Sequence, residues 1–176
     1  MITIVCGTNR KDAVSKILSR IYQQLLNNLN SENTIVDLSE LPSDFAFSAL
    51  YDKSGKNEEF NVIRQQMSQS EKFVFIVPEY NGSFPGVLKT FIDGLAFPDT
   101  FEHKKCALVG LSSGVQGGGL AFSHLTDIFN YGGMYVLALK PKLAQISQNI
   151  DKEKEIVTNE LYRDLLETQA RRLVEF

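Results

Sequence analysis

The segment Phe73-Val-Phe-Ile-Val-Pro-Glu-Tyr-Asn-Gly-Ser83 decides the fold of this chain. Its first five residues are continuously apolar, a pattern typical of a central strand in a parallel sheet covered by helices on both faces. Pro78 ends this strand, and Asn81-Gly82 supplies the geometry of a tight turn. The segment therefore predicts a buried strand that runs directly into a turn.

A helix is expected after this turn. Ser83 can cap it, Pro85 falls in its first turn, where a missing N–H costs little, and it should run to about Leu95.

Strand and helix signals alternate along the rest of the chain. Short β-rich runs predict further strands at Met1–Cys6, Thr34–Leu38, Cys106–Leu111 and Met134–Leu139. Apolar residues at helical spacing predict helices over 14–29, 57–70, 120–130 and the charged tail from Asp151, with an irregular stretch at Ser39–Lys56. Parallel neighbours need crossover helices, so this alternation predicts an α/β fold. No repeat or linker interrupts it, and we expect a single domain over residues 1–176.

Composition excludes several classes of function. The net charge is −3 with no lysine or arginine stripe, which argues against nucleic-acid binding. Apolar runs are only strand-sized, so we expect no membrane attachment. Cys6 and Cys106 form no C-x-x-C pair and are expected to be free, buried thiols in a reducing cytoplasm. His103 and His124 are isolated, so no metal site is expected.

Three segments that follow predicted strands look unlike ordinary connections: Gly7–Ser15, Pro78–Gly86 and Ser112–Gly119. In an open α/β sheet, ligands bind beyond the carboxyl ends of the strands, so these segments should meet around one ligand. The first precedes a helix N-terminus, where unpaired N–H groups favour an anion, and Arg10 adds positive charge. This composition suits a phosphate monoester, although a polar turn with an ordinary helix cap would have the same composition.

The other two segments can hold a flat ring. Tyr80 offers an aromatic wall at a strand end, and the turn around it supplies backbone donors and acceptors for a polar edge. The small side chains of Ser112–Gly119 let backbone approach a ligand closely. The alternatives are a turn whose Tyr80 packs on the next helix and an ordinary glycine-rich loop.

At these residues the chain resembles the NADPH-dependent FMN reductase family, which also contains flavin-dependent quinone, chromate and azo-dye reductases. The segment from Pro78 to Asp93 is similar to the family's most distinctive signature, and two further motifs match its phosphate loop and third ligand loop: Gly7-Thr8-x-Arg10 and Ser113-Gly114-x-x-Gly117-Gly118. The resemblance implies a three-layer α/β/α flavodoxin-like fold with a five-stranded parallel sheet of order 2-1-3-4-5. It also implies a homodimer or homotetramer.

The same resemblance implies non-covalent FMN with NAD(P)H as co-substrate. The residues implied to bind FMN are Thr8, Arg10 and Ser15 at the phosphate, Pro78, Glu79, Tyr80, Asn81 and Gly82 at the ring and ribityl chain, and Ser113 and Gly114 at the opposite polar edge of the ring. Two residues depart from the family's loop. The loop commonly has a serine at the position of Ala13, and Asp12 adds a negative charge beside it. Loss of one charged hydrogen bond predicts an FMN affinity weaker by about tenfold or more.

The implied function is electron transfer from NAD(P)H through FMN to a small acceptor such as a quinone, free flavin, azo compound or metal oxyanion. The flavin carries the chemistry, so no catalytic side chain is expected. Two alternatives remain open: a flavodoxin-type electron carrier, and a flavin-free scaffold or phospholigand-binding protein. Several aromatic residues of the predicted loops are either core satellites or part of a substrate pocket or dimer contact: Phe45, Phe47, Tyr51, Phe84, Phe97 and Phe101.

Overall fold

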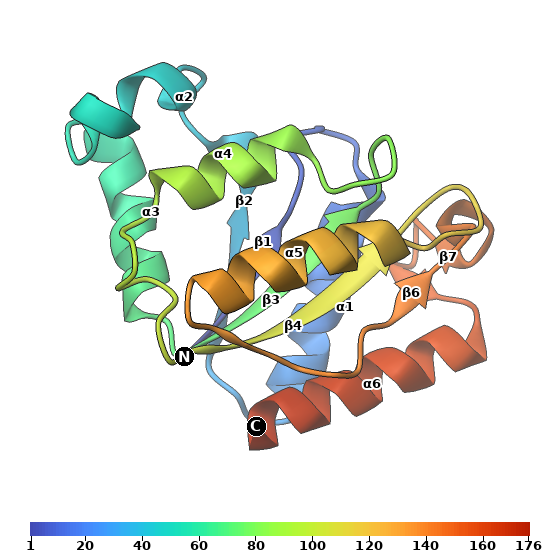
Figure 1. Cartoon of the computed structure of the whole chain (residues 1–176). Coiled ribbons are helices and arrows are strands. Elements are labelled where there is room, and N and C mark those ends of the chain that lie inside the picture. Colours follow the sequence, from blue (N-terminus) through green and yellow to red (C-terminus); the bar gives the residue numbers. More distant parts are fainter.

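The apolar run predicted as the central strand forms β3, Lys72–Pro78, in the middle of a parallel sheet. The structure, a computed structural model, describes residues 1–176. The strand order is β2-β1-β3-β4-β5 (Figure 1), which confirms the predicted 2-1-3-4-5 arrangement. The other strands of this sheet are β1 (Ile2–Cys6), β2 (Asn33–Asp37), β4 (Lys105–Leu111), β5 (Tyr135–Val136) and β6 (Lys142–Leu143).

Alternate side chains of β3 enter two different hydrophobic cores. Phe73 and Phe75 pack on one face with residues of three helices, α3 (Glu58–Gln69), α4 (Gly86–Gly94) and α5 (Gly119–Tyr131). Val74 and Ile76 pack on the other face with residues of α1 (Val14–Asn28) and α6 (Glu160–Glu175). Helices on both faces complete the predicted three layers (Figure 1) and explain why β3 is apolar throughout.

The fifth strand is shorter than the predicted Met134–Leu139. Strand β5 pairs with β4 only at Tyr135 and Val136, and the chain returns to β4 as β6. Between them the buried side chain of Gln169, on α6, takes the place of ladder bonds: its Nε2 donates to Leu108 O at 2.9 Å and to Leu139 O at 2.7 Å. A side chain distant in sequence therefore satisfies backbone carbonyls that the apolar pattern assigned to a continuous strand.

The prediction of a helix from Asp151 is also wrong. Residues 150–157 form an antiparallel hairpin of β7 (Ile150–Asp151) and β8 (Ile156–Val157), and α6 begins only at Glu160. Asn159 is the N-cap, and its Oδ1 accepts a hydrogen bond from Tyr162 N at 3.2 Å. The apolar spacing of the tail concealed this boundary, because Ile156 continues the pattern of the helix without belonging to it.

Other predicted elements agree with the structure to within about two residues at their ends. The stretch Ser39–Lys56 lies mostly outside regular structure but contains the short helix α2 (Phe45–Ser48) and the single turns η1 (Leu38–Glu40) and η2 (Tyr51–Lys53). Cys6 and Cys106 are free and buried, as predicted. No helix combines the length and apolar character that crossing a membrane requires.

Candidate functional site

The carboxyl ends of β1, β3 and β4 meet at one edge of the sheet, since Cys6 pairs with Ile76 and Pro78 pairs with Leu111. At this edge lies a cavity of about 470 Å³, a volume within the range of roughly 300–1,000 Å³ typical of small-molecule sites. All three predicted loops contribute to its lining, which consists of Arg10, Asp12, Ala13, Val14, Ser15, Pro78, Glu79, Tyr80, Asn81, Leu111, Ser112, Ser113, Ile146, Ser147 and Lys152.

The first loop presents unsatisfied donors to this cavity. Ala13 is the N-cap of α1 and provides no side-chain cap. The N–H groups of Ala13, Val14 and Ser15 donate to no acceptor in the chain, and the buried Ser15 Oγ has no hydrogen-bond partner. Buried polar groups are nearly always paired, so this helix terminus has the donor set of an anion site.

Thr8 contributes to the site indirectly. It is fully buried and is absent from the cavity lining. Its Oγ1 lies 2.9 Å from the hydroxyl of Tyr80 and accepts a hydrogen bond from Arg10 N at 3.3 Å. Thr8 therefore fastens the first loop to the second.

The second loop is a two-residue hairpin turn. Tyr80 and Ser83 exchange both backbone hydrogen bonds, at 2.9 and 3.0 Å. Asn81 and Gly82 have φ angles of 51° and 73°, the pair of positive values that a type I′ turn requires. Their N–H groups donate to nothing in the chain and remain available to a ligand. The predicted Asn-Gly turn is confirmed.

The predicted capping of α4 by Ser83 is wrong. The N-cap of α4 is Pro85, and no side chain caps it, so Pro85 precedes the first turn. Ser83 Oγ instead lies 2.8 Å from His124 Nδ1 on α5, while its backbone closes the turn with Tyr80. Because the backbone of Ser83 closes the turn and its hydroxyl contacts His124, Ser83 does not cap α4.

The third loop is folded back on itself by Ser112. Its Oγ donates to Gly114 O and accepts from Gly117 N, each at 2.8 Å. The carboxylate of Glu79 accepts from Gly118 N at 3.0 Å and so joins the second loop to the start of α5. Ser113 and Gly114 keep unpaired N–H groups.

Most of the predicted site residues line the cavity: Arg10, Ser15, Pro78, Glu79, Tyr80, Asn81 and Ser113. Thr8, Gly82 and Gly114 belong to the same loops without lining it. Four lining residues lie outside the three predicted loops. Leu111 ends β4, and the other three, Ile146, Ser147 and Lys152, come from the turn η3 (Ile146–Gln148) and the β7–β8 hairpin. A signal for the hairpin existed in Asp151, whose carboxylate accepts bonds from two following N–H groups, a habit of aspartate in turns.

Residues 1–144 match the family model described as NADPH-dependent FMN reductase. The chain belongs to this family. Membership confirms the predicted enzyme class, an FMN-dependent oxidoreductase that uses NAD(P)H.

Two relatives are named as quinone reductases, which agrees with this enzyme class. A 2-hydroxy-1,4-benzoquinone reductase from Burkholderia sp. is 32% identical over 133 residues, which are 74% of this chain and 70% of that protein. A quinone reductase from Escherichia coli strain K12 is 27% identical over 155 residues, 84% of this chain and 79% of that protein.

Among solved structures, the flavoenzyme NAD(P)H:(acceptor) oxidoreductase FerB from Paracoccus denitrificans superimposes with a TM-score of 0.81. The match covers 99% of this chain and 94% of FerB at 23% sequence identity. This similarity confirms the flavodoxin-like fold of the reductase.

Proposed function

We propose that this reductase binds FMN in the cavity at the carboxyl edge of the sheet and passes electrons from NAD(P)H to a quinone. The observation that supports it most is the unpartnered Ser15 Oγ, buried beside three free N–H groups at the start of α1. A phosphate monoester there would pair these donors, and Arg10 would add the positive charge. In this assignment Thr8 acts by holding the loop in place.

The ring would lie between the second and third loops. Tyr80 is 36% exposed at the cavity wall and offers an aromatic surface, while the rigid turn that contains it fixes the direction of the free N–H groups of Asn81 and Gly82. Pro78 and Glu79 would contact the ring at the strand end. The free N–H groups of Asn81 and Gly82 would be the donors that a polar edge of a heterocycle needs.

Free N–H groups on Ser113 and Gly114 would serve the opposite edge of the ring. Bound FMN would supply the chemistry, hydride acceptance from NAD(P)H and electron delivery to the acceptor, so no side-chain nucleophile is required. The residues named above would bind and orient the ring.

A quinone is the acceptor best supported, because the two relatives described above act on quinones according to their names. Free flavin, azo compounds and metal oxyanions belong to the same proposal as further small acceptors, since one open flavin can reduce several of them. The cytoplasm is the proposed location, in keeping with two free cysteines. The chain as a whole, residues 1–176, is proposed to be one FMN-binding domain.

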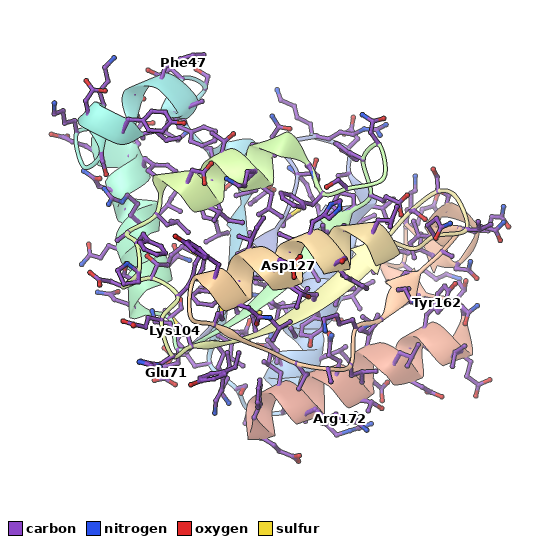
Figure 2. The ribbon with its side chains drawn as sticks, in the orientation of Figure 1. Phe47, Glu71, Lys104, Asp127, Tyr162 and Arg172 are labelled. Atoms are coloured by element: carbon purple, nitrogen blue, oxygen red, sulfur yellow. The ribbon has the colours of Figure 1, made fainter.

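A homo-oligomer is also proposed, with a groove between α4 and α5 as its contact. This groove of about 450 Å³ is lined mostly by apolar residues. The rings of Phe97 and Tyr131 stack with their centroids 5.8 Å apart, yet these residues are 67% and 82% exposed. Its lining carries both signs of charge, an ion pair of Lys89 with Asp93 at 2.7 Å and the carboxylate of Asp127, so a second copy can match it across a two-fold axis. Figure 2 shows Asp127 on α5.

Light scattering should give the mass of a dimer or tetramer, and Tyr131→Glu should lower it to that of a monomer. Phe47→Glu is the matched control, because Phe47 is equally exposed but lies on α2 (Figure 2) and does not line the groove. A monomeric parent protein would contradict the proposed assembly.

One experiment tests the main proposal. Purified protein should be yellow or take up FMN, and stopped-flow mixing with NADPH without oxygen should bleach the flavin, with benzoquinone restoring its absorbance. A flavin that stays oxidised would instead indicate an electron carrier. A protein that stays colourless with added FMN and shows no thermal shift would indicate a flavin-free role.

A further inference from the structure

The β7–β8 hairpin extends the cavity beyond the residues that match the family model, which end at 144. Lys152, at the tip of this hairpin, lines the same cavity as Arg10 and Ser15. The hairpin therefore brings a cation from the C-terminal part of the chain to the start of α1.

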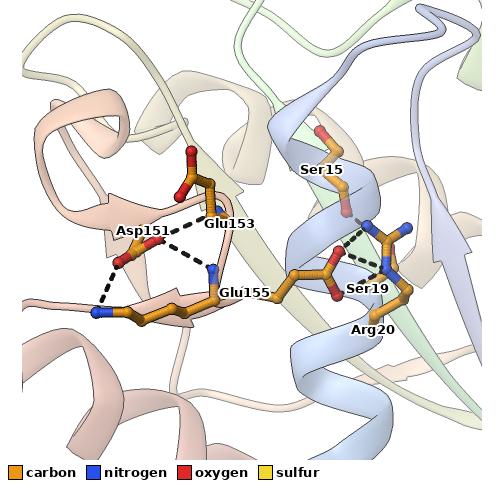
Figure 3. Close-up of polar contacts among 7 residues, drawn as sticks. Ser15, Ser19, Arg20, Asp151, Glu153 and Glu155 are labelled. Carbon is orange, nitrogen blue, oxygen red and sulfur yellow. Dashed lines mark hydrogen bonds and ion pairs between the residues drawn. The ribbon is translucent and has the colours of Figure 1, made fainter.

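Several contacts fix the position of this tip. Ile150 and Val157 at its base are buried in the core beneath α1 and α6. Glu155 forms a two-pronged ion pair with Arg20 of α1 (Figure 3). The turn itself is closed by Asp151, whose carboxylate accepts from the N–H groups of Glu153 and Lys154 at 3.1 and 3.0 Å (Figure 3). The hairpin is tied to the same helix whose N-terminus faces the cavity.

Charge at this end of the cavity is incompletely balanced. Arg10 and Lys152 make no ion pair within the chain, whereas Asp12 adds a negative charge to the same lining. Ala13 contributes no hydroxyl. A phosphate monoester carries about −1.5 to −2 charges at neutral pH, so one arginine opposed by one aspartate leaves it under-compensated.

We propose that Lys152 binds the phosphate group of FMN as the second cationic side chain beside Arg10. This proposal rests on the proposed function, because it assigns the phosphate to the α1 terminus. The flexible stem of the lysine reaches the phosphate as a point charge, which needs no fixed geometry. Lys152 thereby offsets both the aspartate at position 12 and the missing hydroxyl at position 13.

Comparison of two flavins isolates this interaction. FMN and riboflavin share the ring and ribityl chain, but only FMN carries the phosphate. Fluorescence titration of the flavin-free protein should show that Lys152→Met weakens FMN binding about fivefold, the effect of an exposed ion pair at the upper end of its range. Riboflavin binding should not change. Lys152→Arg should keep most of the FMN affinity.

Lys154→Met is the matched control. It removes the same charge from the same hairpin, yet Lys154 does not line the cavity, so both flavins should bind to this variant as to the parent protein. High salt should shrink the difference between Lys152→Met and the parent, because the Debye length falls to about 3 Å at 1 M.

The titrations distinguish failure of the proposal on Lys152 from failure of the proposed function. Equal FMN affinities for Lys152→Met and the parent protein would overturn the proposal and leave the proposed function intact. Equal losses for FMN and riboflavin would also overturn it, since the lysine would then support the loop rather than the phosphate. Absence of flavin binding by the parent protein would instead contradict the proposed function itself.

Discussion

The hydroxyl groups of Thr8 and Tyr80 lie 2.9 Å apart and join two loops that are 72 positions apart in the sequence. Thr8 belongs to the loop after β1 and Tyr80 to the turn after β3. Their hydrogen bond fixes the position of the first loop relative to the second, and these loops are the parts of the cavity proposed to hold the phosphate and the ring. The distance between these two loops is therefore fixed, as binding of a single ligand by both loops requires.

Removing this bond should weaken FMN binding without unfolding the protein. Tyr80→Phe keeps the aromatic wall, and Thr8→Val keeps the buried volume, and each should raise the Kd for FMN about three- to tenfold. The double variant should bind no more weakly than the weaker single variant, because both changes break the same bond. Fluorescence titration measures all four proteins, and strictly additive losses would show that the two hydroxyls act separately.

Glu79 should prove more important as an acceptor than as a charge. Glu79→Gln keeps an oxygen for Gly118 N, while Glu79→Ala leaves that N–H unpaired at the start of α5. We expect the alanine variant to lose about 1–2 kcal/mol of stability and the glutamine variant less than about 1 kcal/mol, the share of the charge at the helix terminus. Urea unfolding distinguishes them, and equal losses would argue that the charge dominates.

Gln169 should be among the most sensitive buried residues. Its side chain donates to Leu108 O and Leu139 O and accepts from the Tyr22 hydroxyl at 3.1 Å. Gln169→Leu would leave three buried polar groups unpaired, and we expect a loss of about 3 kcal/mol. The exposed Gln24→Leu should change stability by less than about 0.5 kcal/mol in the same urea experiment. A loss as small in Gln169→Leu would contradict the bridging role.

Stability should fall at alkaline pH through the buried thiols. Burial, with the nearby Asp37 as a smaller cause, raises the pKa of Cys6 from 9.0 to about 11. The unfolded chain then releases this proton first, so the contribution is complete below pH 9 and is lost as the pH rises towards 11. The expected slope is about 1.4 kcal/mol per pH unit for one thiol.

Cys6→Ala provides the comparison for this slope. It lowers stability at every pH but should give a shallower decline between pH 9 and 11, measured by urea unfolding. Parallel curves for the two proteins would mean that Cys6 does not titrate differently in the folded state. The pKa of Cys106 is raised in the same direction by burial.

The sequence predicted those parts of the fold that depend on local pattern. Continuous apolar character marked β3, and the pair Asn81-Gly82 marked the turn, because positive φ angles restrict which residues occur there. The strand order came from the resemblance to a family rather than from periodicity. The three loops were located by their position after strands, which a parallel sheet brings to one edge.

What escaped prediction depends on contacts between distant residues. The end of β5 is set by Gln169 on α6, and no local pattern around Leu139 reveals it. The role of Thr8 as a link to Tyr80 is equally non-local. Lys152 falls within the helix predicted from Asp151, since charge and spacing alone do not distinguish a solvated helix from a charged hairpin.

The bridging side chain on α6 also bears on how the molecule is made. A nascent chain that has emerged only as far as β6 carries both strands of that sheet edge but not the amide that joins them. Leu108 and Leu139 must then expose their carbonyls to water or to a chaperone until the last helix leaves the ribosome. Completion of this sheet edge during synthesis therefore depends on α6, although every residue that lines the cavity precedes that helix.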